Sequence, residues 1–190
     1  MRIYSNKSMK NPARRGFTLV EILAVLVIIG IASAIVIPQL ATRDDLRAAA
    51  AARILVADLI YAQNMAISQQ RPIYVRFDKA NNKYSLLSVA SSGGDTLMKH
   101  PMTQVNYIQQ FGSATKGLEA VSIDSVDFDG VDSAIVDQFT VAFDEMGAPF
   151  AFSYATNSMS DLKNGVVAIK AGSFTTTITI QPYTGELTVQ

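Results

Sequence analysis

The sequence contains no cysteine and only one histidine among its 190 residues. The absence of cysteine excludes a disulfide framework, a thiolate metal site and a cysteine nucleophile, but leaves export open. The single histidine, His100, lies in the loop sequence "MKHPM", and the chain has no nucleophile elbow, phosphate loop or HExxH motif. A lone loop histidine is typically solvated. The sequence therefore predicts a protein that is not an enzyme and that needs no cofactor.

Acidic residues are absent from the first 16 positions, and basic residues are absent from the last 20. Residues 1–16 carry a charge of +5, whereas residues 17–190 contain 11 basic and 16 acidic side chains and carry about −5 with His100 neutral. The formal net charge of zero hides this division. A short basic head before an apolar run is typical of a targeting segment that stays on the cytoplasmic side of a membrane.

The apolar run extends from Phe17 to Ile37, and Glu21 is its only charged residue. As a helix these 21 residues would be about 31 Å long, close to the roughly 30 Å hydrocarbon core of a bilayer. An acidic residue at the centre of a spanning helix costs about 2.5–3.5 kcal/mol, so Glu21 needs either a partner or a shallow position. Two ordinary interpretations stay open: a signal anchor, and a signal peptide cut after Ala34 at the sequence "ASA".

Helical periodicity continues beyond Pro38 to about Gln70, where Pro72 disfavours further helix. We therefore expect one long helix, half in the membrane and half packed on a domain. Its main apolar row is Leu46, Ala50, Ile54, Ala57, Tyr61 and Met65, and a second row is Leu55, Leu59, Ala62 and Ala66. The residues expected on its solvent-exposed side are Arg43, Asp44, Asp45, Arg47, Arg53 and Asp58.

From Pro72 onward the apolar period changes to two, which indicates strands. The first two predicted strands form a hairpin around an Asn81-Asn82 turn. The predicted strands are residues 72–78, 83–90, 120–128, 138–144, 149–155, 165–171, 174–181 and 185–190. Residues 91 to about 117 are interpreted as an irregular surface loop. The sequence thus predicts an α+β fold, with a long N-terminal helix packed on an antiparallel β-rich domain.

A cluster of acids in "DSVDFDGVD" is the only candidate metal site in the sequence, because hard cations prefer oxygen ligands. Its acids are Asp124, Asp127, Asp129 and Asp132. Placing Gly130 at the sixth position of an EF-hand loop puts Ser125 first and Val136 twelfth, where ligands are required, so that template fails. The favoured interpretation is a solvated acidic turn, and no metal is expected.

The junction around Gly16 closely resembles the processing signal of type IV pilins and of the pseudopilins of type II secretion systems. Its residues are "RRGFTLVE", followed directly by the apolar run. The resemblance implies cleavage between Gly16 and Phe17 by a prepilin peptidase, followed by N-methylation of Phe17. It also implies that Glu21, the fifth mature residue, pairs with the N-terminus of an adjacent subunit in assembly. Pro38 then matches the helix-bending proline of many pilins.

Later segments resemble the GspH/FimT pseudopilin group, which includes minor pseudopilin H of type II secretion. These segments are "LIYAQNMAISQQRPIYVRFD", "FDEMGAP" and "TITIQPYTGELTV". The resemblance implies a pilin-like organisation: a cleaved basic leader at 1–16, a transmembrane and filament-core helix at 17–40, an amphipathic helix at 41–71, and a β-rich periplasmic domain at 72–190.

The function implied by this resemblance is a minor pseudopilin near the tip of the periplasmic pseudopilus. The implied protein is a single-pass inner-membrane protein before assembly. Its implied partners are the prepilin peptidase, other pseudopilins through their N-terminal helices, the inner-membrane assembly platform and the lipid bilayer, with secreted cargo as a further candidate. The alternatives are a minor type IV pilin of FimT/FimU type, in pilus assembly or DNA uptake, and an exported soluble binding protein cut after Ala34.

Nucleic acid is a disfavoured partner, because the exported part of the chain is acidic and phosphate binding needs a basic surface. A local basic patch stays open at Lys79, Lys83, Lys99 and Lys116.

Overall fold

The computed structural model describes residues 16–41, 43–91, 94–128, 138–154 and 156–190. The chain divides into two units, Met1–Thr42 and Arg43–Gln190, which are described separately. The described part of the first unit contains helix α1 (Leu19–Ala41). The second unit contains helix α2 (Asp44–Gln69) and all the strands.

Helix α2 begins just after Arg43. This residue has φ −108° and ψ 33°, outside the helical region, and its carbonyl accepts the Arg47 N–H at 3.1 Å in the first turn of α2. Asp44 and Asp45 lie in that first turn, where carboxylates are favoured by the positive end of the helix dipole. Helix α2 thus has a start of its own, but Thr42 lies outside the described residues, so one continuous helix from α1 into α2 stays a prediction.

The predicted end of the amphipathic helix is confirmed. Gln70 follows α2 in a left-handed conformation with φ 50° and ψ 46°, and its N–H binds the carbonyl of Ala66. This geometry ends the helix at Gln69, three residues before Pro72, which disfavours helix at the residue before it.

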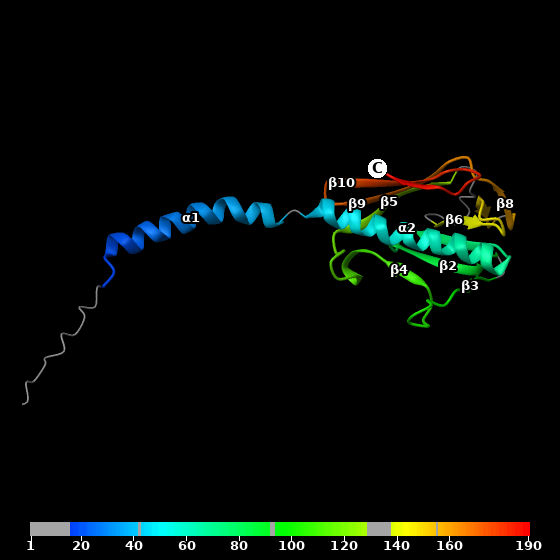
Figure 1. Ribbon diagram of the computed structural model, residues 1–190, viewed down its shortest axis with the longest axis horizontal. Coiled ribbons are helices and arrows are strands. Elements are labelled where there is room, and N and C mark those ends of the chain that lie inside the picture. Colours follow the sequence, from blue (N-terminus) through cyan, green and yellow to red (C-terminus); the bar gives the residue numbers. More distant parts are fainter. Residues whose placement is uncertain (1–15, 42, 92–93, 129–137, 155) are drawn as a thin grey trace, which may run out of the picture. The chain divides into compact units, whose positions relative to one another are not determined.

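The strands of the second unit form two antiparallel sheets (Figure 1). The first has the order β3-β2-β1-β6-β7-β8, with β4 also paired to β2, and the second has the order β11-β10-β9-β5. The first sheet contains β1 (Ile73–Asp78), β2 (Lys83–Val89), β3 (Thr96–Leu97), β4 (Ile108–Gln110), β6 (Gln138–Phe143), β7 (Pro149–Ser153) and β8 (Ser158–Asp161). The second contains β5 (Val121–Phe128), β9 (Gly165–Ala171), β10 (Phe174–Ile180) and β11 (Leu187–Val189). Every predicted strand is present, and the predicted α+β class is confirmed.

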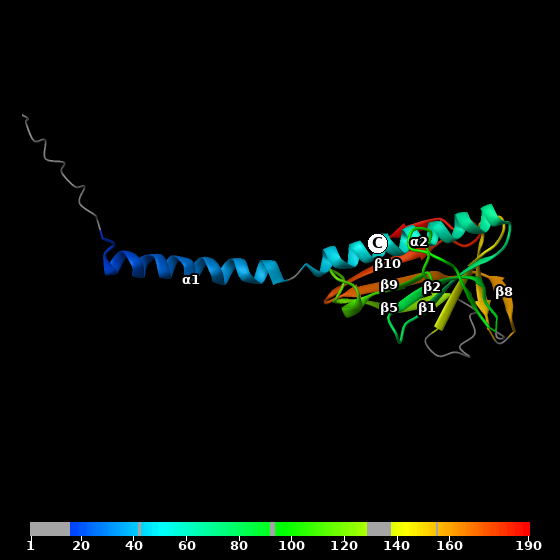
Figure 2. The same cartoon turned by 90° about the horizontal axis from the view of Figure 1, so that it is seen from below.

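Helix α2 lies over both sheets, and the core fills the space between them (Figures 1 and 2). The second predicted row forms the centre of its buried face, since Leu55 and Leu59 are fully buried. The row expected to be central lies at the edge: Leu46 is 61% exposed and Ala57 is exposed. Alanines at 48, 51 and 52 explain the shift, because small side chains let this face of the helix approach the sheets closely.

The segment expected to be an irregular surface loop instead extends the first sheet. Strands β3 and β4 both pair with the outer edge of β2. Tyr107 and Phe111 from this segment are only 7% and 1% exposed, and both belong to the core. Strands of two or three residues are too short to give an alternating pattern, so tertiary pairing rather than local sequence creates them.

Asn82, in the turn between β1 and β2, joins the two sheets. Its side-chain oxygen accepts the Ile123 N–H at 2.7 Å, and its side-chain amide donates to the Val121 carbonyl at 2.8 Å. Its backbone has φ 53°, a left-handed conformation that asparagine tolerates better than most residues.

Replacing Asn82 by alanine is expected to destabilise the fold by about 2–3 kcal/mol. The change removes two hydrogen bonds between the sheets and places a Cβ-bearing residue without a polar side chain in the left-handed region. Urea unfolding of the detergent-solubilised chain, followed by circular dichroism, measures this loss. Asn82→Gly also removes the two side-chain hydrogen bonds but adopts the left-handed conformation without strain. Its loss of stability therefore measures the two hydrogen bonds alone. Free energies of unfolding within about 0.5 kcal/mol of the parent for both variants would contradict the assignment.

Candidate functional site

The predicted cleavage site lies in an accessible, non-helical segment. Gly16 and Phe17 precede the first residue of α1, and Phe17 is 77% exposed among the described residues. No described atom lies within 4 Å of the position that a Cβ on Gly16 would occupy. A protease needs access to the backbone that it cuts, so this exposed, non-helical position suits the predicted cut.

Glu21 lies in the first turn of α1, where Thr18 caps the helix. The Glu21 N–H donates to the Thr18 hydroxyl oxygen at 3.2 Å and to the Thr18 carbonyl at 3.1 Å. This is one half of a capping box, the T-x-x-E pattern visible in "TLVE", which the sequence analysis missed. The carboxylate also lies at the positive end of the helix dipole. Glu21 therefore has a local role in this helix, and its pairing with an adjacent subunit stays a prediction.

Helix α1 is apolar on every side, as expected for a helix surrounded by lipid or by other helices. Its large side chains are exposed in the separate first unit, including Leu19 at 80%, Leu26 at 64% and Ile28 at 64%. Pro38 falls within the helical range of α1, but its side chain lies outside the described part. Its role as a helix-bending residue stays a prediction.

Among the described residues, α2 is the helix long and apolar enough by composition to cross a membrane, whereas Leu19–Ala34 counts as a shorter apolar helix. The apolar face of α2 is buried against both sheets, however, and the carboxylate of Asp58 lies midway along it. These features are typical of a core helix of a folded domain, and we assign α2 that role.

The acidic cluster is only partly within the described residues. Asp124 and Asp127 are exposed on β5, and the Asp127 carboxylate accepts a hydrogen bond from the Asn164 amide at 2.7 Å. Asp129 and Asp132 lie outside the described residues. Within the part of the chain that the structure describes, no three histidine or acidic side chains form a group suited to a metal ion.

Asp58, expected on the solvent-exposed side of the helix, is instead half-buried and bound by two tyrosines. The hydroxyl of Tyr84 donates to one carboxylate oxygen at 2.6 Å, and that of Tyr107 donates to the other at 2.9 Å. Burial raises the pKa of Asp58 above its ordinary value, although the two hydrogen bonds and the nearby His100 act in the opposite direction. The position of Asp58, between Leu55 and Leu59 in the sequence, could have indicated a partly buried carboxylate. Its two tyrosine partners could not be identified from the sequence.

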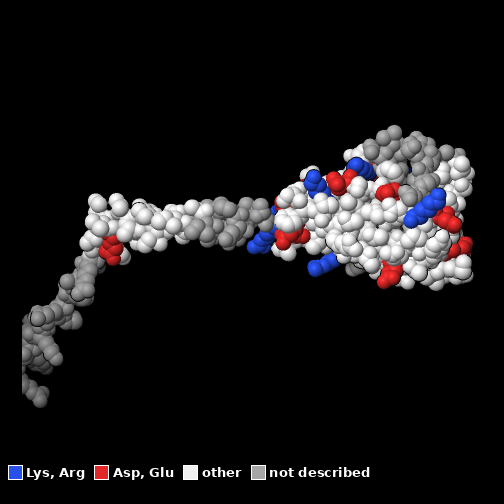
Figure 3. All heavy atoms as spheres, turned by 90° about the horizontal axis from the view of Figure 1, so that it is seen from above, with Lys and Arg blue, Asp and Glu red and all other residues white. Residues whose placement is uncertain are grey.

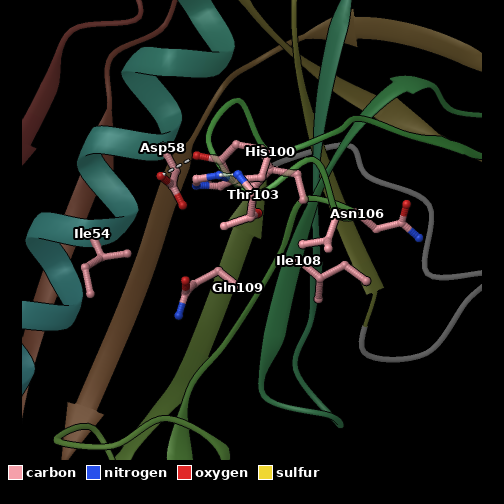
Figure 4. Close-up of a pocket in the computed structure, with 9 residues that line it drawn as sticks. Ile54, Asp58, His100, Thr103, Asn106, Ile108 and Gln109 are labelled. Carbon is pink, nitrogen blue, oxygen red and sulfur yellow. Dashed lines mark hydrogen bonds between the residues drawn. The ribbon is translucent and has the colours of Figure 1, made fainter.

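A cavity with a volume of about 340 Å³ opens beside Asp58, between α2 and the segment 100–109 (Figure 4). His100 lines this cavity and is half-buried rather than fully solvated, with its ring 4.8 Å from that of Tyr107. The His100 Nδ1 accepts the backbone N–H groups of Met102 and Thr103 at 3.3 and 3.4 Å. The lining residues are Ile54, Asp58, His100, Thr103, Val105, Asn106, Tyr107, Ile108 and Gln109.

Basic and acidic side chains are interspersed on the face of the second unit that Figure 3 shows. Two of the lysines in the candidate basic patch are engaged locally. Lys83 lies 3.6 Å from the Asp78 carboxylate, and the Lys99 ammonium donates to the Asn106 side-chain oxygen at 2.8 Å. The expectation that nucleic acid is not a partner stays a prediction.

The raised pKa of Asp58 predicts a specific dependence of stability on pH. The folded chain holds the Asp58 proton over a pH range in which the unfolded chain has lost it, because the folded pKa lies above 3.8. The contribution of Asp58 to stability therefore falls as pH rises from about 4 through the folded pKa, and the penalty remains at neutral pH. The free energy of unfolding of Asp58→Asn, relative to the parent, should thus increase between about pH 4 and about pH 7.

Urea unfolding at several pH values measures this difference. Tyr84→Phe serves as the opposing control, since it removes a hydrogen bond that favours the charged carboxylate. It should raise the pKa of Asp58 further and extend the pH range over which stability falls. If the free energies of unfolding of the parent and of Asp58→Asn changed in parallel with pH, Asp58 would have the same pKa in the folded and the unfolded chain. That result would contradict the prediction.

Residues 11–37 match the family model of the prokaryotic N-terminal methylation motif. The N-terminal part of the chain is therefore prepilin-like, as the resemblance predicted. Among solved structures, the minor pseudopilin EpsH from the type 2 secretion system of Vibrio cholerae is similar, with a TM-score of 0.49 and 14% identity. That similarity covers 76% of this chain and 96% of the solved chain. A comparison with curated protein sequences found no match. Assignment to the GspH/FimT subgroup stays a prediction.

Proposed function

We propose that this protein is a minor pseudopilin of a type II secretion system, a structural subunit near the tip of the periplasmic pseudopilus. The observation that carries the proposal is the N-terminal methylation motif at residues 11–37, which includes the apolar run and precedes an α+β domain. The protein acts by assembly rather than by catalysis, and it uses no cofactor.

The proposed mechanism begins with cleavage between Gly16 and Phe17 by a prepilin peptidase on the cytoplasmic side. The chain is then a single-pass inner-membrane protein with its second unit in the periplasm. During assembly the apolar surface of α1 exchanges lipid for the helices of other pseudopilins, since both surroundings are apolar. The carboxylate of Glu21 pairs with the Phe17 amine of a neighbouring subunit. An assembly platform in the inner membrane extrudes the subunit, and secreted cargo contacts the filament.

A minor type IV pilin is the second candidate, because such a pilin has the same N-terminal motif and uses the same processing. The two candidates differ in what deletion of the gene removes: secretion of folded proteins across the outer membrane, or assembly of a surface pilus.

The mass of the N-terminal peptide, from membranes with and without the prepilin peptidase, tests the proposal. We expect a chain that begins at methylated Phe17 only when the peptidase is present. A chain that begins at Ile35 would overturn the proposal and indicate an exported soluble protein. A chain that retains Met1 in the presence of the peptidase would indicate a simple membrane anchor.

A further inference from the structure

The cavity beside Asp58 is a feature that the proposed function does not use. Its volume of about 340 Å³ falls in the range of sites that hold ligand groups, and its walls come from α2 on one side and the segment 100–109 on the other. Figure 4 shows Asp58 extending from the helix toward this segment, while the side chain of Asn106 points away.

The Asp58 carboxylate belongs to no described ion pair, although His100 on the wall of the same cavity favours its charged form. Within the described part of the chain, the ion pairs are Arg47–Asp44, Arg76–Asp95 and Lys83–Asp78, and none of them includes Asp58. The two hydrogen bonds that Asp58 accepts come from neutral tyrosine hydroxyls. A carboxylate offers about four acceptor positions, so about two remain. A cation at this point would offset the cost of partial burial.

The rim of the cavity is apolar and exposed. Val105 is 61% exposed and Ile108 is 46% exposed, and both line the cavity. Met102, adjacent to the lining residue Thr103, is 87% exposed. Exposed apolar side chains around a pocket are typical of a protein-binding surface rather than a site for a free ion. A charged group at the bottom of a cavity, surrounded by apolar side chains at the rim, is also the arrangement in which an interface contact is shielded from water.

We propose that this cavity binds a lysine or arginine side chain presented by a partner protein, with the cationic head group paired to the Asp58 carboxylate. The aliphatic part of such a side chain packs against Val105 and Ile108, as the stems of long basic residues do on apolar surfaces. This inference goes beyond the proposed function, because it does not depend on N-terminal processing.

The test uses two small probes that differ in charge but not in shape: N-acetyl-arginine amide and the neutral N-acetyl-citrulline amide. Each is titrated into the full chain in detergent micelles, and NMR follows the His100 imidazole and the backbone amides of residues 100–109. We expect saturable shifts in these signals with the arginine probe, and binding at least about tenfold weaker with the citrulline probe. Absent shifts with the arginine probe, or equal binding of both probes, would overturn the proposal.

Two variants locate the binding group. Asp58→Asn keeps the shape of the side chain and should weaken arginine-probe binding about tenfold or more, whereas Asp127→Asn, at an exposed position of β5, should leave it unchanged. Gln109→Lys introduces a cation from the cavity wall and should block the probe even where Asp58→Asn perturbs the fold. Parent-like binding by either Asp58→Asn or Gln109→Lys would overturn the assignment of Asp58 as the anchor.

Discussion

Glu21→Gln is expected to leave cleavage at Gly16–Phe17 intact and to remove the protein from assembled filaments. The variant keeps the size of the side chain but lacks the charge, so the Phe17 amine of a neighbouring subunit would be buried in an apolar filament core without its partner. Breaking a buried ion pair in this way typically costs about 3–5 kcal/mol. The ratio of the protein in sheared filaments to that in membranes measures the effect, and we expect a fall of at least about a hundredfold.

Thr18 provides the control that separates assembly from local helix capping. Thr18→Ala removes the hydroxyl that caps α1 and should cost about 0.5–2 kcal/mol of helix stability, while leaving the charge of Glu21 in place. Glu186→Gln changes the net charge equally at an exposed position in the second unit. If Thr18→Ala reproduced the full loss of assembly, Glu21 would act through the cap and not through a neighbouring subunit.

Phe77→Ala is expected to destabilise the second unit by about 3–5 kcal/mol. Phe77 is fully buried on β1, with its ring 5.7 Å from that of Tyr84 and 5.7 Å from that of Phe128. The change would therefore leave a cavity between the two sheets, since Phe128 belongs to β5 of the second sheet. The shift in the urea midpoint, together with an unchanged slope, gives the loss in free energy.

Phe174 is the matched control for that substitution. It lies on β10 and is 49% exposed, so Phe174→Ala loses less buried area and creates no closed cavity. We expect a loss of about 1 kcal/mol or less. Equal losses for the two variants would mean that the space around Phe77 collapses when its ring is removed.

Sequence reasoning predicted the element order well because periodicity is a local property. The turn at Asn81-Asn82 and the strands on either side of it appear as expected. The same reasoning missed β8, a four-residue strand with every residue exposed, since it has no buried face to produce an alternating pattern. It found both apolar rows of α2 but left out Ala48, Ala51 and Ala52, which are buried with the second row.

The sequence by itself determined the N-terminal pattern: the basic residues before Gly16, the motif around Gly16 and Phe17, and the apolar run with Glu21. These features depend on neighbouring residues and on hydropathy, and both can be read along the chain. Only the tertiary structure decided the setting of Asp58, because Tyr84 lies 26 positions away in the sequence and Tyr107 lies 49 away. Burial, a hydrogen-bonding partner and a cavity wall are each made by segments far apart in sequence, so they exist only once the two sheets and α2 have packed together.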